Sequence, residues 1–256
     1  MSRKLYADRR GISPVLGTTL LLAAIITVVS IFLAVWIPSE LSRRERDYIL
    51  GTEGTFRELK GTIEGLSLGD NRSVNLSMSP GSLPLIPNPK VAGTLSVIPA
   101  ENASDLGRLR FDWGDWSLVY ESGMIIFTQE NTILMKSPPG VLTVRQDNNN
   151  FDVYFNVFRV SGFEDSKSGT GTSNISIYVP ENQPSPPPPI ENDNVVIKIN
   201  SSYMNIWTQY LANEVNELNS MGITASSDNN GTLKIIGDNK KIHYYQNVTN
   251  IEISLK

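Results

Sequence analysis

The sequence contains no cysteine and a single histidine, His243, and these absences exclude several classes of functional site. Without cysteine, the chain has no disulfide framework, no thiolate zinc site and no cysteine nucleophile. One histidine cannot supply a histidine-rich metal site, and it leaves only one candidate for a serine–histidine triad. We therefore expect a protein that is not an enzyme and that requires no cofactor or metal ion.

The chain also lacks a run of basic residues outside its N-terminus. Its net charge is −4, and residues 61–256 carry 13 Lys/Arg against 20 Asp/Glu, a difference of −7. A mildly acidic region of this kind argues against nucleic acid as a partner. Positive charge is concentrated in residues 1–11, where Arg3, Lys4, Arg9 and Arg10 stand against one acidic residue.

Charge is absent from residues 12–37, a run of 26 residues with the sequence ISPVLGTTLLLAAIITVVSIFLAVWI. As an α-helix it would be about 39 Å long, whereas the hydrocarbon core of a bilayer is about 30 Å thick. The run is longer than the apolar core of a cleavable secretory signal, which has about 7–15 residues. We predict a single transmembrane helix at residues 12–37. The positive flank places residues 1–11 in the cytoplasm and the bulk of the chain outside the cell membrane.

The start of this run has a recognisable order: Arg9-Arg10-Gly11, then Ile12-Ser13-Pro14-Val15-Leu16-Gly17, then the apolar residues. It resembles the N-terminus of archaeal type IV pilins, which carry a class III signal peptide. The resemblance implies that a prepilin peptidase cuts between Gly11 and Ile12. The processing site would consist of Arg9, Arg10, Gly11 and Ile12.

The same resemblance implies that the mature helix can leave the lipid and pack against other pilin subunits in a filament. Gly17, Ala23 and Ala24 offer small surfaces for close helix approach. One residue departs from the bacterial pattern, because Leu16 stands where bacterial relatives usually carry glutamate.

Residues 38–66 keep a helical pattern, since Phe56, Leu59, Ile63 and Leu66 recur at spacings of three and four. We predict a stalk helix there, with Pro38 as a possible kink. Two interpretations stay open: a short helix packed on the external domain, or the exposed half of a long spine helix.

Residues 67–180 predict an all-β, sandwich-like domain, because short runs rich in Val, Ile, Phe and Tyr alternate with turn residues. Tyr120–Gly123 followed by MIIFTQ, the Pro138-Pro139 break and the segment VFRVSGFEDSKSGTGTSNISIYV resemble the ectodomain of an uncharacterised archaeal pilin-like family. That resemblance implies a topology and no activity. The expected strands are residues 73–78, 93–99, 109–113, 116–121, 123–129, 132–137, 141–146, 151–160 and 174–179.

One local cluster in this domain is a candidate ligand-binding site: Asp112, Trp113, Asp115 and Trp116. Two aromatic rings beside two carboxylates could contact a sugar or a calcium ion. The alternative is a turn at Gly114-Asp115 whose tryptophans cover a sheet edge, and we favour this alternative.

Residues 181–194 form a proline-rich linker, and residues 195–256 predict a small α+β module. The module would contain a strand at 195–200 and a helix that begins after Ser201 or Ser202 and runs to about Ser220. One face of this helix is expected to be apolar and to consist of Ile206, Trp207, Tyr210, Leu211, Val215 and Leu218. Gly222 would end that helix. Further strands are expected at 223–227 and 232–236, with two more reaching Leu255.

Seven Asn-x-Ser/Thr sequons occur, all on the predicted outer side, and they are typical of a cell-surface glycoprotein. They are Asn71, Asn75, Asn102, Asn174, Asn200, Asn230 and Asn247.

These features predict an archaeal type IV pilin-like cell-surface protein with a structural or adhesive role, as a minor or tip subunit of a pilus. Its partners would be membrane lipid, a prepilin peptidase and other pilin subunits. The alternative is a single-pass, membrane-anchored extracellular binding protein that never polymerises. An extracytoplasmic hydrolase that relies on carboxylates alone is a third and weaker hypothesis.

Overall fold

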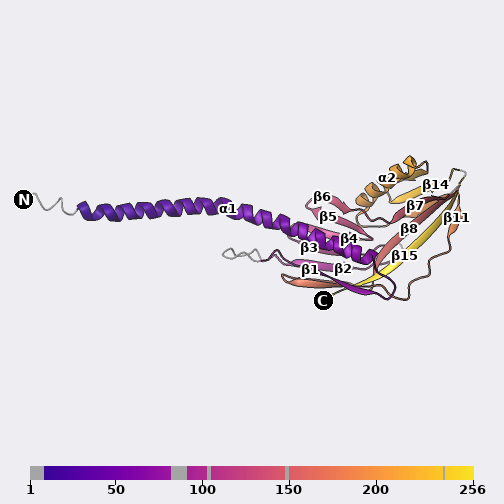
Figure 1. Cartoon of the computed structure of the whole chain (residues 1–256), viewed down its shortest axis with the longest axis horizontal. Coiled ribbons are helices and arrows are strands. Elements are labelled where there is room, and N and C mark those ends of the chain that lie inside the picture. Colours follow the sequence, from indigo (N-terminus) through magenta and orange to yellow (C-terminus); the bar gives the residue numbers. More distant parts are fainter. Residues whose placement is uncertain (1–8, 82–90, 103–104, 148–149, 239) are drawn as a thin grey trace, which may run out of the picture. The chain divides into compact units, whose positions relative to one another are not determined.

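A computed structural model describes residues 9–81, 91–102, 105–147, 150–238 and 240–256, with the backbone alone at residues 9–14 and at Asp147. The chain divides into two compact units, Met1–Leu50 and Gly51–Lys256. Figure 1 gives the order of the elements along the chain. Helix α1 (Arg9–Glu64) contributes to both units.

In the first unit, α1 forms one uninterrupted helix that contains Pro38. The sequence predicted a transmembrane helix at 12–37 and a stalk helix at 38–66, and it left open whether the stalk is a short helix or the outer half of a long spine helix. The helix continues through Pro38 because a proline removes one backbone donor while the surrounding turns keep their own hydrogen bonds. The coarse prediction of a long, apolar N-terminal helix is confirmed.

In the second unit, the last turns of α1 pack on the β-rich core. Phe56, Leu59 and Ile63 of the predicted apolar stripe are at most 1 % exposed, whereas Leu66, its fourth residue, is half-buried and lies beyond the end of the helix. The Lys60 ammonium donates to the carbonyl of Pro138 at 2.5 Å. Arg57 donates to the carbonyl of Lys136 at 2.9 Å, which ties the helix to the end of a strand.

The first sheet is an antiparallel array in which five successive strands form a meander. Its strands are β2 (Gly93–Ile98), β3 (Arg108–Trp113), β4 (Trp116–Glu121), β5 (Met124–Gln129), β6 (Thr132–Ser137) and β9 (Asp165–Gly169). They lie in the order β6-β5-β4-β3-β2-β9. All six residues of β4 are buried, so the sheet is covered on both faces at this central strand.

The second sheet draws its strands from both ends of the unit. Its strands are β1 (Asn71–Ser77), β7 (Leu142–Asp147), β8 (Asn150–Ser161), β10 (Thr172–Tyr178), β11 (Ile190–Asn192) and β15 (Lys241–Leu255). The order is β1-β10-β15-β8-β7, and β11 pairs with β15. A third, small sheet has the order β12-β14-β13, from β12 (Asn194–Lys198), β13 (Thr224–Ser227) and β14 (Thr232–Ile236).

Strand β15 corrects the predicted domain boundaries. It lies between β8 and β10, pairing with β8 in parallel over twelve positions from Lys241↔Asn150 to Glu252↔Ser161 (Figure 1). Residues 195–256 are therefore not a separate module, because their last strand is central to the sheet of the predicted sandwich. The proline-rich linker is corrected as well, since its residues Ile190–Asn192 form strand β11.

Helix α2 (Met204–Ser220) buries the face that the sequence predicted. Its end is a Schellman motif: Gly222 has φ +79°, Gly222 N donates to Asn219 O, and Ile223 N donates to Leu218 O at 3.0 Å. Its start differs from the prediction, because the N-cap residue is Tyr203 and no side chain caps the helix. The buried residues of α2 are Ile206, Trp207, Tyr210, Leu211 and Leu218.

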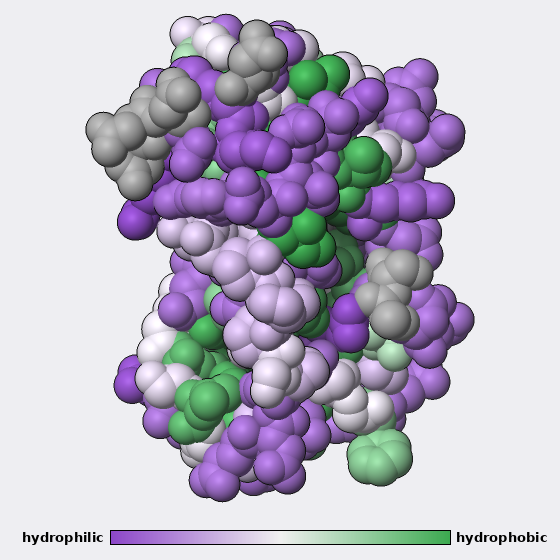
Figure 2. Space-filling view, turned by 90° about the vertical axis from the view of Figure 1, so that its right-hand side faces the viewer, coloured by the Kyte–Doolittle hydropathy of each residue, from purple (hydrophilic) through white to green (hydrophobic). Residues whose placement is uncertain are grey.

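One continuous core joins α2 and the third sheet to the two larger sheets. Val119 on β4, Ile126 on β5, Val153 on β8, Ile197 on β12 and Trp207 on α2 all belong to it. Away from this core, the face drawn in Figure 2 is mainly hydrophilic, and its apolar residues form small, separate patches.

Candidate functional site: an exposed apolar helix with a charged end

The apolar part of α1 exposes every side chain that the structure describes between residues 15 and 36. Leu20 and Val35, for example, are each 70 % exposed. Leaving a large aliphatic side chain in water forgoes about 1.5–3 kcal/mol relative to its burial. A buried core helix of a globular protein would have these residues covered, and here none of the most apolar segment is buried. The helix is long and apolar enough to span a membrane once.

The threonine hydroxyls inside this segment are already satisfied within the helix. Thr18 Oγ1 donates to the carbonyl of Val15 at 2.9 Å, and Thr27 Oγ1 donates to that of Ala23 at 2.8 Å. A hydroxyl bonded back to its own helix needs no water partner. These threonines therefore do not prevent the segment from lying in lipid.

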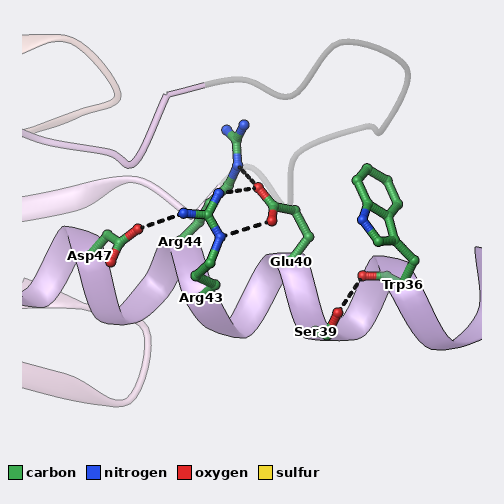
Figure 3. Close-up of polar contacts among 6 residues, drawn as sticks. All are labelled: Trp36, Ser39, Glu40, Arg43, Arg44 and Asp47. Atoms are coloured by element: carbon green, nitrogen blue, oxygen red, sulfur yellow. Dashed lines mark hydrogen bonds and ion pairs between the residues drawn. The ribbon is translucent and has the colours of Figure 1, made fainter.

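A charged cluster follows the apolar segment (Figure 3). Both nitrogens Nε and Nη2 of Arg43 donate to Glu40, at 3.0 and 2.8 Å, and Arg43 also contacts Asp47 at 3.3 Å. Arg44 donates to Glu40 at 3.1 Å. The hydrogen bonds from Arg43 and then Arg44 lower the pKa of Glu40 to about 2. The cluster stays charged at neutral pH and marks an end that lipid cannot cover.

Trp36 lies between the apolar segment and this cluster (Figure 3). Its carbonyl accepts a hydrogen bond of 2.9 Å from Ser39 Oγ. Tryptophan is enriched where hydrocarbon meets water in membrane proteins. The order apolar helix, tryptophan, ion-paired cluster is the order that a membrane–water boundary requires.

The predicted processing site lies at the beginning of α1. Arg9, Arg10, Gly11 and Ile12 have helical backbone, and their side chains lie outside the described residues. Residues 1–8 of the predicted leader also lie outside the described residues. Cleavage after Gly11 stays a prediction.

The predicted ligand cluster forms a tight hairpin instead of an open site. Trp113 pairs with Trp116 across the turn Gly114-Asp115, and Gly114 has φ +59°. Trp113 and Trp116 are only 9 % and 2 % exposed, with ring centroids 5.8 Å apart. Asp112 pairs with a neighbour on its own strand, and Asp115 accepts a bond of 3.0 Å from Gln129. The favoured alternative, a turn with packed tryptophans, matches this geometry, and two buried indoles leave little surface for a ligand.

The sequons lie on the surface of the β-rich unit. Asn71, Asn75, Asn102, Asn200, Asn230 and Asn247 are exposed, whereas Asn174 is half-buried. Asn174 Nδ2 donates to Asn75 Oδ1 at 2.9 Å across strands β10 and β1. A glycan on Asn174 would be attached to this same nitrogen, which would then keep a single N–H. Glycosylation itself stays a prediction.

A buried carboxylate was missed in the sequence. Glu121, at the end of β4, is 1 % exposed, and its Oε1 accepts hydrogen bonds from Ser201 Oγ and from Trp207 Nε1. Burial raises the pKa of Glu121 above its ordinary value, and the two hydrogen bonds offset part of that effect. The only local signal was a lone glutamate beside an apolar strand, and this pattern does not predict which residues bond to the glutamate.

Two further features bear on the hydrolase hypothesis. Residues 65–69 match G-x-S-x-G around Ser67, but a helix precedes them and strand β1 follows, whereas a nucleophile elbow joins a strand to a helix. His243 Nδ1 lies 3.0 Å from Asp152 Oδ1, on paired positions of β15 and β8. Within the described ranges, no group of three or more His, Asp or Glu residues is arranged to hold a metal ion.

The chain matches a family of unknown function, DUF7289, over residues 10–253. It belongs to this family. The match includes both the apolar helix and the β-rich unit. No curated protein and no solved structure matches the chain. Membership in DUF7289 assigns no activity.

Proposed function

We propose that the protein is an archaeal type IV pilin-like subunit of the cell surface, with a structural or adhesive role and no enzymatic activity. One observation carries the proposal. An uncharged helix, exposed at all described side chains from residue 15 to 36, directly follows the prepilin-like sequence Arg9-Arg10-Gly11. The helix accounts for membrane attachment, and the motif accounts for how its N-terminus would be made.

The proposed mechanism is an exchange of partners around one helix. Lipid covers the apolar segment while the subunit waits in the membrane, and helices of other subunits cover it in a filament. Both surroundings are apolar, so the exchange keeps the same side chains out of water. A β-carbon at Gly17 would have no neighbour within 4 Å, so this position is open to a second helix.

The charged cluster supports a boundary at one end of the span. Arg43 and Arg44 share Glu40, and with Asp47 they form a near-neutral group that has no place in hydrocarbon. The excess of positive charge in residues 1–11 favours a cytoplasmic N-terminus. The β-rich unit, Gly51–Lys256, would then lie outside the cell, where it presents surfaces for contact. Its size favours a minor or tip subunit over a closely packed major one.

The experiment is N-terminal sequencing and intact mass measurement of the full chain isolated from membranes of an archaeal host with a prepilin peptidase. We expect the mature chain to begin at Ile12. Gly11→Leu should block this processing, and Gly17→Leu is the matched control that should be processed normally. A chain that retains Met1 or Ser2 in that host would overturn the proposal.

The second candidate is a membrane-anchored binding protein that stays a single subunit. A hollow of about 420 Å³ on the β-rich unit favours it, because a binding protein needs such a surface and a purely structural filament subunit does not. Shearing of cells separates the two candidates: a filament subunit appears in the sheared fraction, and a lone anchored protein remains with the membrane.

A further inference from the structure

One face of the second sheet is polar across three neighbouring strands. Asn71 on β1 pairs with Tyr178 on β10, and Tyr178 pairs with Glu252 on β15. Two residues further along the strands, Ser176 pairs with Ser254. Because side chains alternate between the faces of a sheet, these residues lie on one face, and the intervening Ile177 and Ile253 point to the core.

A loop turns this polar face into a hollow. Residues 162–165 connect β8 to β9 and form a wall beside the three strands, enclosing about 420 Å³. The loop is held in place, because Asp165 Oδ2 accepts a hydrogen bond of 2.9 Å from the backbone N–H of Leu255. Gly162 has φ +99°, and a β-carbon there would lie 3.6 Å from Glu252 Cγ, so the loop runs directly against that side chain.

The rim of the hollow carries an unusually exposed aromatic ring. Phe163 is 91 % exposed, although burying a phenylalanine side chain is worth about 1.5–3 kcal/mol. Tyr178 supplies a second ring on the floor. Ser176 Oγ donates to Asn71 Oδ1 at 3.1 Å, which leaves the amide NH₂ of Asn71 free to donate to a ligand.

The charge of the hollow selects among ligands. Its lining includes the carboxylates of Glu164, Asp165 and Glu252 against the ammonium of Lys256, so it repels anions. Neither Glu164 nor Glu252 forms an ion pair with another described residue. No group of acidic residues in the described part of the chain is arranged to hold a metal ion, which disfavours calcium. Carboxylates, an amide and hydroxyls beside two aromatic rings instead match a neutral molecule that has hydroxyl groups and an apolar C–H face.

We propose that this hollow binds a neutral sugar unit of a glycan. The C–H face of the sugar ring stacks on Phe163, its hydroxyls donate to Glu252, and the amide of Asn71 donates to a sugar oxygen. The volume lies in the range of small-molecule sites, about 300–1,000 Å³. The inference gives the proposed surface protein a ligand and so depends on a surface role. Binding by purified protein is measured independently of processing and assembly, so the two can fail separately.

The test uses the full chain in lipid nanodiscs, because detergents with sugar head groups would compete for the hollow. The protein is produced in a bacterium without N-glycosylation, since Asn71 is also a sequon and its own glycan would fill the site. The probes are lactose, maltose and mannobiose, titrated calorimetrically, with a disaccharide that contains glucuronic acid as the anionic comparison.

We expect at least one neutral disaccharide to saturate the protein and the anionic one to bind at least about tenfold more weakly. Phe163→Ala should weaken neutral-sugar binding about tenfold. Leu68→Ala is the matched control, because Leu68 is also apolar and 62 % exposed but does not line the hollow, and it should bind as the unaltered chain does.

Three results would overturn the proposal. They are the absence of saturable binding of every neutral probe to protein with normal circular dichroism, equal binding of the anionic probe, and equal effects of Phe163→Ala and Leu68→Ala. Glu252→Gln adds a second measurement at an exposed residue: it keeps the shape of the side chain and should weaken binding of the neutral probe, since a carboxylate is the stronger acceptor.

Discussion

Trp207 Nε1 donates a hydrogen bond of 2.6 Å to Glu121 Oε1, and each of these two residues is 1 % exposed. Trp207 belongs to α2 and Glu121 ends β4, so the bond joins elements 86 residues apart in the chain. Ser201 Oγ donates to the same oxygen from the segment that leads into α2. A buried carboxylate needs such partners, because an unpaired one would lose its hydration without compensation. The pair therefore links the C-terminal helix to the first sheet.

Replacing the donor should weaken this link. Trp207→Phe keeps an aromatic ring but removes the N–H, and we expect it to lower the free energy of unfolding by about 1–3 kcal/mol. Urea unfolding of the full chain, followed by circular dichroism, measures the change. Trp36→Phe is the control, since Trp36 is 42 % exposed and lies in the apolar helix. Equal stability of the two variants would contradict the role given to the indole N–H.

The raised pKa of Glu121 predicts a pH dependence of stability. Between the ordinary carboxyl pKa and the raised folded-state pKa, the folded chain binds more protons than the unfolded chain. Stability from this group is therefore fully present below the ordinary pKa and decreases as the pH rises through the folded-state pKa. Glu121→Gln cannot ionise, so its stability relative to the unaltered chain should rise with pH across this window.

Urea unfolding at a series of pH values tests this dependence. Glu58→Gln replaces an exposed carboxylate on α1 and serves as the control variant. A profile that is identical for Glu121→Gln and the unaltered chain would show that the buried carboxyl does not titrate in this way.

We predict that a large side chain at position 17 impairs filament assembly without affecting the folding of the subunit. A β-carbon there meets nothing within 4 Å, so Gly17→Leu should leave the folded subunit and its amount in the membrane unchanged. In a filament, a leucine would keep neighbouring helices apart, and the sheared fraction should fall to background. Gly54→Leu is the control in the same helix, where a β-carbon also has no neighbour within 4 Å. Normal filament yield from Gly17→Leu would argue against packing at this position.

The charged cluster predicts a measurable shift at Glu40. Its pKa is lowered to about 2 chiefly by the hydrogen bonds from Arg43, so Arg43→Ala should move it up toward the ordinary value of 4.5. A depressed carboxyl pKa contributes stability above pH 4.5 that is lost as the pH falls toward 2. Carboxyl ¹³C chemical shifts of Glu40 in nanodiscs measure the titration. Arg46→Ala, at a neighbouring exposed arginine, should leave the Glu40 titration where it is.

Local patterns were sufficient for most strands. Strands β4 (Trp116–Glu121), β6 (Thr132–Ser137) and β14 (Thr232–Ile236) have the predicted bounds, because apolar alternation and flanking turn residues are both local signals. Strand β9 was missed and predicted as a loop. Its residues, Asp165–Gly169, are polar, and their strand conformation comes from pairing with β2 at a sheet edge.

These local patterns could not predict the pairing of strands that lie far apart in the chain. The C-terminal segment was predicted as two strands of a separate module, and it forms the single strand β15 between β8 and β10. The proline-rich segment looked like a boundary because proline interrupts local structure. No local pattern in that segment predicts that residues after it pair with β8, whose paired positions lie 91 residues earlier in the chain.

The candidate sites show the same difference between local sequence patterns and tertiary contacts. Trp113 and Trp116 looked like a ligand pair by composition, but the core covers both rings, whereas the exposed ring of Phe163 gave no sequence signal.

The sequence by itself determined the apolar helix, its flanking charges, most strand positions and the apolar face of α2, because each depends on the order of neighbouring residues. Only the tertiary structure decided the partner of β15, the partners of Glu121 and which aromatic rings face solvent. These depend on contacts between residues far apart in the chain, and such contacts are set by the packing of whole elements against one another.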